Sequence, residues 1–126
     1  MAIPFKVGID IVSVRRMKDS AERFGKSFLN KIFTPKEQAY CEGKRNKYES
    51  YAARFAAKEA VIKAKGGGKG RMHFRSIEVV RSKTGEPAIF ISPKARQALA
   101  IQPDAEFRLT LAHEREFAIA TVLLSD

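Results

Sequence analysis

Cysteine is scarce in this chain of 126 residues, and long apolar runs are missing. The single cysteine, Cys41, excludes an internal disulfide, and it has no CxxC partner or His-rich neighbour of the kind that forms a metal site. The longest apolar runs, such as residues 117–124, are far too short to cross a bilayer, and the first residues lack the pattern of a signal peptide. We therefore expect a cytoplasmic protein that has no membrane as a partner.

Acidic residues are also few, and this is the strongest compositional signal. The chain has 14 Asp and Glu against 24 Lys and Arg, a formal net charge of +10. Such a surface attracts anions, whether nucleic acid, an anionic membrane, phosphorylated small molecules or an acidic protein. The charge alone does not choose among these partners. The length, with 44% hydrophobic residues, predicts a single domain over residues 1–126 with no room for a second catalytic domain.

The first strand and the helix after it follow from the alternation of residue types. The segment "FKVGIDIV" has the period of two that predicts a strand over residues 5–12. We expect one apolar row to face the core, namely Phe5, Val7, Ile9 and Ile11. Asp10 then lies on the opposite face, near the end of the strand. The segment from Ser13 predicts a helix with a basic side that ends at Gly25.

Helix signals dominate the first half of the chain and hairpin signals the second. Thr34, Pro35 and Glu37 form a capping box, which marks the start of a helix. The further predicted elements are helices over residues 34–45, 47–65 and 92–100 and hairpins over residues 75–92 and 106–124. This order predicts an α+β fold, with an antiparallel sheet packed against helices.

Glu59 interrupts the apolar face of the long helix. At about 100° per residue, it lies within about 20° of the centre of an otherwise apolar stripe. The other members of that stripe are Tyr48, Tyr51, Ala52, Phe55 and Ile62. A buried carboxylate without a partner is costly, so Glu59 requires a cation, a metal or a wet cleft. Lys63, one turn onward, offers an intrahelical ion pair, and a functional site is the alternative.

The long helix runs into the glycine-rich loop "KGGGKG", which suits a phosphate. Glycines let a ligand approach the backbone closely, and Lys63, Lys65 and Lys69 supply positive charge. The loop is no Walker A motif, and a flexible helix C-cap is the alternative role. Asp10 is a second carboxylate close to a basic helix, although it could simply cap that helix. Two carboxylates near lysines and a glycine loop suit a hard divalent cation that also binds a substrate phosphate.

Four segments in this order resemble holo-[acyl-carrier-protein] synthase, the small bacterial 4′-phosphopantetheinyl transferase: "VGIDIV", "RFAAKEA" before a glycine-rich loop, "TGEP" and "LTLAH". The resemblance implies that phosphopantetheine is transferred from coenzyme A to a serine of acyl carrier protein, with release of adenosine 3′,5′-bisphosphate and with Mg²⁺ as cofactor. It also implies a homotrimer whose active sites lie at the subunit interfaces. It points to fatty acid biosynthesis.

The resemblance further implies a role for individual residues. Asp10 and Glu59 would hold the magnesium ion, and Lys63 would stand beside the transferred phosphate. The residues that would line the coenzyme site are Arg54, Lys58, Gly66, Gly68, Gly70 and Pro87, with His113 from a neighbouring chain. Arg16 would be a docking residue for the carrier protein. Because carrier proteins are acidic, Arg15, Arg16 and Arg23 on one helix would also steer the carrier in, and a solvated helix face is the alternative role of these arginines. Either Glu59 or a metal-bound water held by Asp10 would accept the serine proton.

Two expectations come from the residues themselves and not from the resemblance. His113 ends a strand with the inward row Phe107, Leu109 and Leu111, so a hydrogen-bonded core histidine is favoured over a general base. The last strand is apolar on both faces, because Ala118, Ala120, Val122 and Leu124 alternate with Phe117, Ile119 and Leu123. The second face is therefore expected to be covered by another copy of the chain.

A basic nucleic-acid-binding domain without enzymatic activity is the alternative from another class. It would explain the net charge of +10 and the stretch "KGGGKGRMHFR". No strand shows the aromatic pattern of an RNA-recognition motif, and no zinc or helix-turn-helix signature is present. This alternative also leaves the position of Glu59 unexplained, so we expect no nucleic acid partner.

Overall fold

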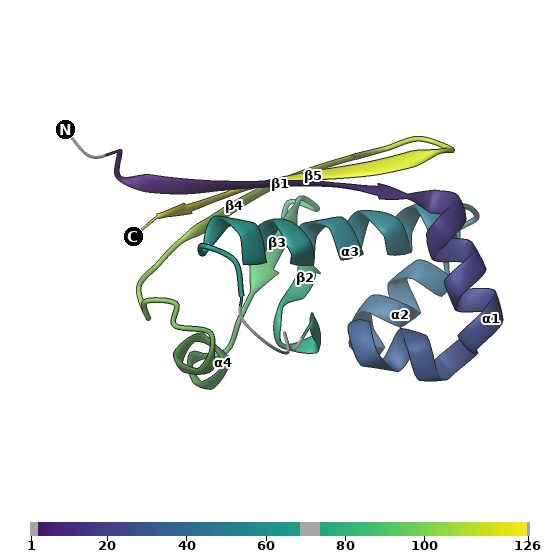
Figure 1. Ribbon diagram of the computed structural model, residues 1–126, viewed down its shortest axis with the longest axis horizontal. Coiled ribbons are helices and arrows are strands. Elements are labelled where there is room, and N and C mark those ends of the chain that lie inside the picture. The colour runs from purple at the N-terminus through teal and green to yellow at the C-terminus, as the bar shows by residue number, and fades with distance from the viewer. Residues whose placement is uncertain (1–2, 69–73, 126) are drawn as a thin grey trace.

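The computed structural model describes residues 3–68 and 74–125, and these form an α+β fold (Figure 1). In chain order the elements are β1 (Phe5–Ser13), α1 (Val14–Ile32), α2 (Pro35–Glu42), α3 (Lys47–Ala64), the 3₁₀ turn η1 (Phe74–Ser76), β2 (Glu78–Arg81), β3 (Pro87–Phe90), α4 (Pro93–Ala98), β4 (Phe107–His113) and β5 (Phe117–Ser125). The fold class and the order of elements predicted from the sequence are confirmed. None of the helices in the described ranges is both long enough and apolar enough to cross a bilayer.

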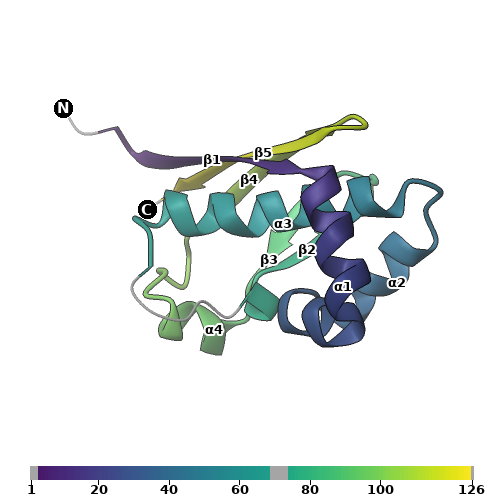
Figure 2. The ribbon, with the colours of Figure 1, turned by 45° about the vertical axis from the view of Figure 1, so that its right-hand side comes forward.

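α3 is the centre of the fold. A three-stranded antiparallel sheet in the order β1-β5-β4 covers one side of it, and α1, α2 and the two-stranded sheet β2-β3 pack around the rest (Figures 1 and 2). Two apolar clusters meet along this helix, one toward α1 and α2 and one toward β5 and the small sheet. The helix fits between these layers because six of its buried residues are alanines: Ala52, Ala53, Ala56, Ala57, Ala60 and Ala64.

β1 runs across α3 with its backbone in contact with the helix at Gly8. A Cβ atom at this position would lie 1.9 Å from the carbonyl oxygen of Ala60. Only glycine therefore permits this approach. The contact fixes the distance between strand and helix two residues before Asp10, and so it controls where Asp10 lies.

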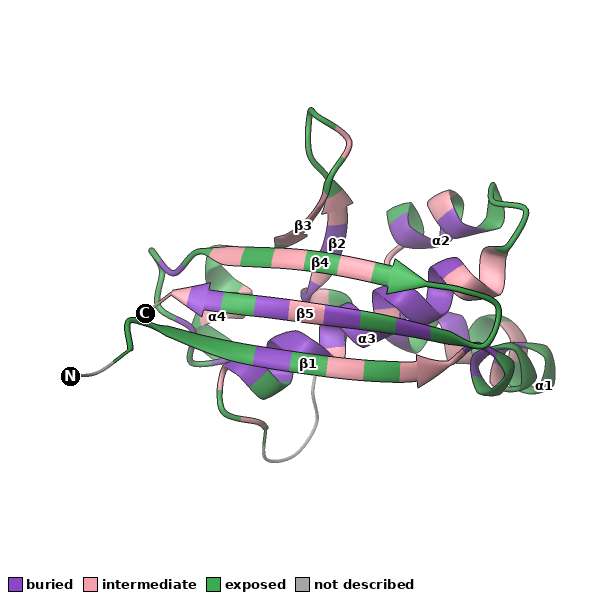
Figure 3. Cartoon of the chain, turned by 90° about the horizontal axis from the view of Figure 1, so that it is seen from above, coloured by how far each residue is buried: buried purple, intermediate pink, exposed green. Residues whose placement is uncertain are grey.

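The prediction of which face of β1 is covered was wrong. Gly8 is buried and Asp10 and Val12 are partly buried on the side toward α3, whereas the apolar row Phe5, Val7, Ile9 and Ile11 is exposed on the outer face (Figure 3). The same register places Phe107, Leu109 and Leu111 opposite Leu124, Val122 and Ala120, on the helix side of the sheet. The outer face of β5 carries Phe117, Ile119 and Leu123, which are exposed.

The helical predictions differ from the structure mainly in α1. Gly25 has a positive φ of 62°, as expected of a stop, but the chain kinks there and turns helical again as far as Ile32. α2 begins with the predicted capping box at Thr34 and Glu37. The long helix ends at Ala64, one residue before the predicted end.

Candidate active site

Asp10 and Glu59 line one cavity, although they come from different elements. The cavity has a volume of about 420 Å³ and lies between β1, α1 and α3. Its lining residues are Asp10, Ile11, Val12, Ser13, Arg16, Met17, Ser20, Phe28, Phe55 and Glu59. Asp10 reaches it because it is on the helix side of β1, not on the opposite face as expected. The apolar stripe of α3 thus opens into a cavity at the point where Glu59 interrupts it.

Lys63 forms its ion pair with Asp10, not the intrahelical pair with Glu59 that was the alternative explanation of that carboxylate. Its Nζ lies 2.9 Å from Oδ1 of Asp10 and donates to the carbonyl oxygen of Ile9 at 3.1 Å. The Lys63 side chain is 53% exposed, whereas that of Asp10 is 15% exposed. An exposed lysine therefore pairs with a largely buried carboxylate.

The environment of Glu59 disfavours its charge. Burial raises the pKa of this carboxyl group first, the nearby Asp10 raises it further, and Lys63 opposes both effects. The two carboxylates are thus close enough to repel each other. Hard oxygen donors of this kind suit a divalent cation such as Mg²⁺, which commonly takes one or two carboxylates together with substrate phosphates. The described residues contain no cluster of three or more potential ligands among His, Cys, Asp and Glu, so substrate or water would complete the coordination.

The basic helix α1 borders this cavity. Arg15, Arg16 and Arg23 are exposed on it, and Arg16 also lines the cavity. Ser13 caps the helix, since its Oγ accepts from the backbone N–H of Arg16 at 3.2 Å. The alternative that Asp10 serves as the cap is therefore wrong. Of the three arginines, only Arg16 is among the residues that line the cavity.

Arg54 lies in a second, smaller pocket of about 300 Å³ on another side of α3. We call it the arginine pocket; it is lined by Lys36, Glu37, Tyr40, Arg54, Val79, Val80 and Arg81. The guanidinium carbon of Arg54 lies 3.9 Å from the ring centroid of Tyr40, and Nη1 of Arg81 donates to the Tyr40 hydroxyl at 2.6 Å. Arg54 is 5% exposed, and within the described residues its Nε has no hydrogen-bond partner. A buried, unsatisfied guanidinium nitrogen is a natural contact for an anion.

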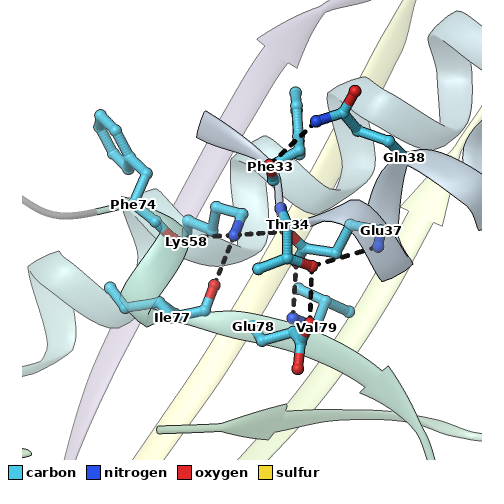
Figure 4. Close-up of polar contacts among 9 residues, drawn as sticks. All are labelled: Phe33, Thr34, Glu37, Gln38, Lys58, Phe74, Ile77, Glu78 and Val79. Carbon is cyan, nitrogen blue, oxygen red and sulfur yellow. Dashed lines mark hydrogen bonds and ion pairs between the residues drawn. The ribbon is translucent and has the colours of Figure 1, made fainter. Parts of the chain in front are cut away.

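The expectation that Lys58 lines the coenzyme site is corrected by the structure. Its side chain is 0% exposed, and its Nζ lies 2.8 Å from Oε1 of Glu37, which is also 0% exposed (Figure 4). The same Nζ donates to the carbonyl oxygens of Phe74 and Ile77. Burial lowers the pKa of Lys58, while Glu37 raises it in part. Because all its donors are directed into the protein, Lys58 does not face a ligand.

The remaining candidate residues lie at the ends of elements. Pro87 begins β3 opposite Arg81, next to the arginine pocket. His113 ends β4 and is exposed, with Nδ1 2.8 Å from Oε1 of Glu49, so the expected hydrogen bond is present but the core position is wrong. Gly66 has a φ of 103°, which confirms a C-cap role for the start of the glycine loop. Gly68 is exposed, and Gly70 lies outside the described residues.

The two groups of candidate residues point to different sides of α3. Arg54 and Glu59 are five positions apart, which is about 140° around the helix at 100° per residue. Sequence reasoning missed Tyr40 and Arg81 in the arginine pocket. Tyr40 gives no local signal in the sequence. Its place in the pocket becomes visible only in the folded structure, where α2 and β2 bring Tyr40 and Arg81 into contact.

The comparisons with known proteins agree with this fold. A family model, described as the 4′-phosphopantetheinyl transferase superfamily, matches residues 6–122. The chain therefore belongs to this family of transferases. Within it, the chain is 43% identical over 117 residues to a holo-[acyl-carrier-protein] synthase of Halothermothrix orenii, with 93% of this chain and 94% of the relative covered. It is 42% identical over 120 residues to the enzyme of the same name from Koribacter versatilis, with 94% and 96% covered.

Solved structures give the same result. The crystal structure of the Helicobacter pylori holo-[acyl-carrier-protein] synthase in complex with coenzyme A matches with a TM-score of 0.81 at 34% identity, and 94% of this chain and 99% of that chain are covered. The Neisseria meningitidis enzyme matches with a TM-score of 0.81 at 31% identity, with 96% and 98% covered. The particular proteins that this chain resembles are thus holo-[acyl-carrier-protein] synthases.

Proposed function

We propose that this protein transfers the 4′-phosphopantetheine group from coenzyme A to a serine of an apo acyl carrier protein and releases adenosine 3′,5′-bisphosphate. The observation that carries the proposal is the cavity shared by Asp10 and Glu59, with Lys63 at its rim. Membership of the transferase family supports the reaction class. The coenzyme A complex of a relative supports the donor.

The chemistry needs charge neutralisation and alignment more than covalent catalysis, because negative charge is spread over phosphoryl oxygens in the transition state. Asp10 and Glu59 would hold Mg²⁺, which neutralises this charge when bound. Lys63 lies close enough to Asp10 to contact a phosphate held there. Glu59 lines the same cavity and would be one acceptor for the serine proton.

The arginine pocket would hold the anionic end of the coenzyme, through Arg54 and Arg81. These residues face a different side of α3 from Glu59, and the arginine pocket shares no lining residue with the cavity of the carboxylates. We propose that each complete site combines the carboxylates of one subunit with basic residues of another, including His113. The homotrimer implied by the resemblance would meet this need.

The outer face of the three-stranded sheet supplies a surface for this assembly. Val7, Ile9 and Ile11 of β1 are 54%, 52% and 61% exposed, and Phe117, Ile119 and Leu123 of β5 extend the patch (Figure 3). A contiguous apolar face of this kind marks an interaction surface. Val122, by contrast, is 0% exposed toward α3, so a charge there would disrupt the core instead of testing the assembly.

The exposed face of α1 would bind the carrier protein. Arg15, Arg16 and Arg23 supply positive charge for an acidic partner, and Phe24, which is 58% exposed, lies beside Arg23. An aromatic ring among arginines is a typical composition for the core of an interface. Because Arg16 also lines the cavity, a partner on this helix would place its serine close to the carboxylates.

One experiment tests the proposed function directly. The protein is incubated with coenzyme A, Mg²⁺ and an apo acyl carrier protein, and the mass of the carrier protein is measured by mass spectrometry. We expect the mass of one phosphopantetheine group to be added, and we expect chelation of Mg²⁺, Asp10→Ala and Glu59→Ala each to prevent the addition. No mass shift from a folded wild-type protein would refute the function, and full activity in either variant would remove that carboxylate from the site.

A further inference from the structure

The ion pair between Glu37 and Lys58 has no assigned role in the proposed transfer, yet Glu37 is one of the residues that line the arginine pocket. Both side chains are completely buried, at 2.8 Å from Oε1 to Nζ. Removing two opposite charges from water costs about as much as their attraction returns, so a buried pair is weak evidence for stability as such. What it provides, and apolar residues of the same volume do not, is a fixed and directional geometry.

This pair joins three parts of the chain (Figure 4). Lys58 of α3 donates to the carbonyl oxygen of Phe74 at 2.8 Å and to that of Ile77. Glu37 of α2 accepts the backbone N–H of Val79 on Oε2 at 2.7 Å and that of Thr34 on Oε1 at 2.9 Å. The start of α2, the middle of α3 and the first residues of β2 are thereby held to one another by a single buried network.

Each key member of the arginine pocket lies close in sequence to one of these contacts. Arg54 is one helical turn before Lys58 on α3, and Tyr40 is three residues after Glu37 on α2. Arg81 lies two residues after Val79 and so projects from the same face of β2. The distances of 3.9 Å from Arg54 to the Tyr40 ring and 2.6 Å from Arg81 to its hydroxyl therefore depend on how α2, α3 and β2 are joined.

We propose that Glu37 and Lys58 are positioning residues, which set the geometry of the arginine pocket and thereby its affinity for the anionic end of the donor substrate. The identity of that ligand rests on the proposed function, whereas the geometric part of the inference does not. Neither side chain contacts the ligand in this proposal. Both act through Arg54, Tyr40 and Arg81.

The first test uses the double variant Lys58→Met with Glu37→Gln, which removes both charges and leaves an acceptor for the N–H of Val79. We expect the KM for coenzyme A to rise about tenfold, because small displacements of binding groups are costly, while kcat and the KM for the carrier protein stay near the wild-type values. The affinity for adenosine 3′,5′-bisphosphate, measured by calorimetry, should fall by the same factor. Should the double variant fail to fold, Glu37→Asp, which keeps the charge and shortens its reach, is measured in the same way.

Ser92→Ala is the matched control for a loss of stability alone. It removes the N-cap of α4, where the Ser92 Oγ accepts the backbone N–H of Ala95 at 3.2 Å, and no residue of α4 lines the arginine pocket. We expect it to lower Tm and to leave the KM for coenzyme A unchanged. An equal rise of that KM in Ser92→Ala would show that the effect follows stability, and it would overturn the inference.

The second test needs no substrate. Burial raises the pKa of Tyr40, but Arg54, Arg81 and Lys44 lower it by more, so the net pKa is below the usual value. The ionisation of the Tyr40 hydroxyl is followed by ultraviolet absorbance as the pH is raised. The step in the titration curve that is missing in Tyr40→Phe is assigned to Tyr40. We expect the double variant to shift the transition to higher pH, because the arginines move away from the ring.

The outcomes separate the inference from the proposed function. A folded double variant with a wild-type Tyr40 transition and a wild-type KM would overturn the positioning role. A wild-type protein that transfers nothing would refute the function, yet the absorbance titration would still decide whether the pair sets the pocket geometry.

Discussion

Replacing Gly8 with alanine should impair both folding and transfer, because the backbone of β1 touches α3 at this residue. A Cβ atom there would lie 1.9 Å from the carbonyl oxygen of Ala60 and 2.8 Å from the backbone nitrogen of Ala64. Both atoms belong to the backbone of a buried helix. No rotamer change relieves the contact, so the strand itself must move.

The size of the movement sets the size of the effect. Real Cβ atoms essentially never approach closer than 3.0 Å, so β1 and α3 must separate by about 1.1 Å. Overpacking of this kind typically costs about 1–3 kcal/mol. For a domain of this length we expect Tm to fall by roughly 3–15 °C. Asp10 would move with the strand, away from Glu59 and Lys63, and a displacement of about 1 Å at a reacting centre can cost about 100-fold in rate.

Circular dichroism would give Tm, and mass spectrometry of the carrier would give kcat/KM. Gly43→Ala is the control, because Gly43 caps α2 with a φ of −78°, and an added Cβ there meets nothing closer than 3.6 Å. A wild-type Tm in Gly8→Ala would refute the close contact. A lowered Tm with an unchanged rate would refute the link between this contact and the position of Asp10.

Three further substitutions test the rest of the site. The pKa of Glu59 is raised in the folded state by burial and by Asp10, so the stability of the wild-type protein should decline as the pH rises through that pKa. Glu59→Gln should abolish this decline, raise Tm at neutral pH and lose transfer. A lower Tm of Glu59→Gln at neutral pH would contradict the reasoning. Arg16→Glu should raise the KM for the carrier several-fold and leave that for coenzyme A unchanged, whereas equal effects on both would count against docking on α1. Ile9→Lys on the outer sheet face should give folded monomers in sedimentation with transfer lost, and a fully active monomer would disprove the shared site.

The fold could be predicted from the sequence wherever the signal was local. Capping residues, helical and two-residue periodicity and turn residues located both hairpins and the start of each α-helix named in the predictions, including the capping box at Thr34. The covered face of β1 could not be predicted, because periodicity separates two faces without saying which one meets the rest of the chain. The apolar row that includes Ile9 was assigned to the core on hydrophobicity, yet Gly8 brings the other face into contact with α3. The helical turn after Gly25 was missed because a glycine with positive φ can kink a helix as well as end it.

The candidate site shows the same division between local and long-range signals. Glu59 was identified because a carboxylate in an apolar stripe is visible within a single helix. Lys58 was misassigned because its partner, Glu37, is 21 residues earlier in the chain and meets it only through tertiary packing. Tyr40 was missed for the same reason, since nothing near it in the sequence indicates that Arg81 of β2 will contact its hydroxyl.

The retention of a carboxylate at position 59 is itself an argument for function. A structural role would require a partner that pairs with the charge, but the nearest candidate on the helix, Lys63, is hydrogen-bonded to Asp10 and to the carbonyl oxygen of Ile9, and its charge offsets only part of the rise in the pKa of Glu59. Burial and Asp10 both act against the ionised form of Glu59, so at neutral pH the free protein loses stability by keeping it charged. A glutamine would fit the same helix without that loss. A divalent cation held by both residues would make the two carboxylates favourable neighbours, and it would supply the charge neutralisation that transfer of a group from a phosphate-bearing donor such as coenzyme A needs.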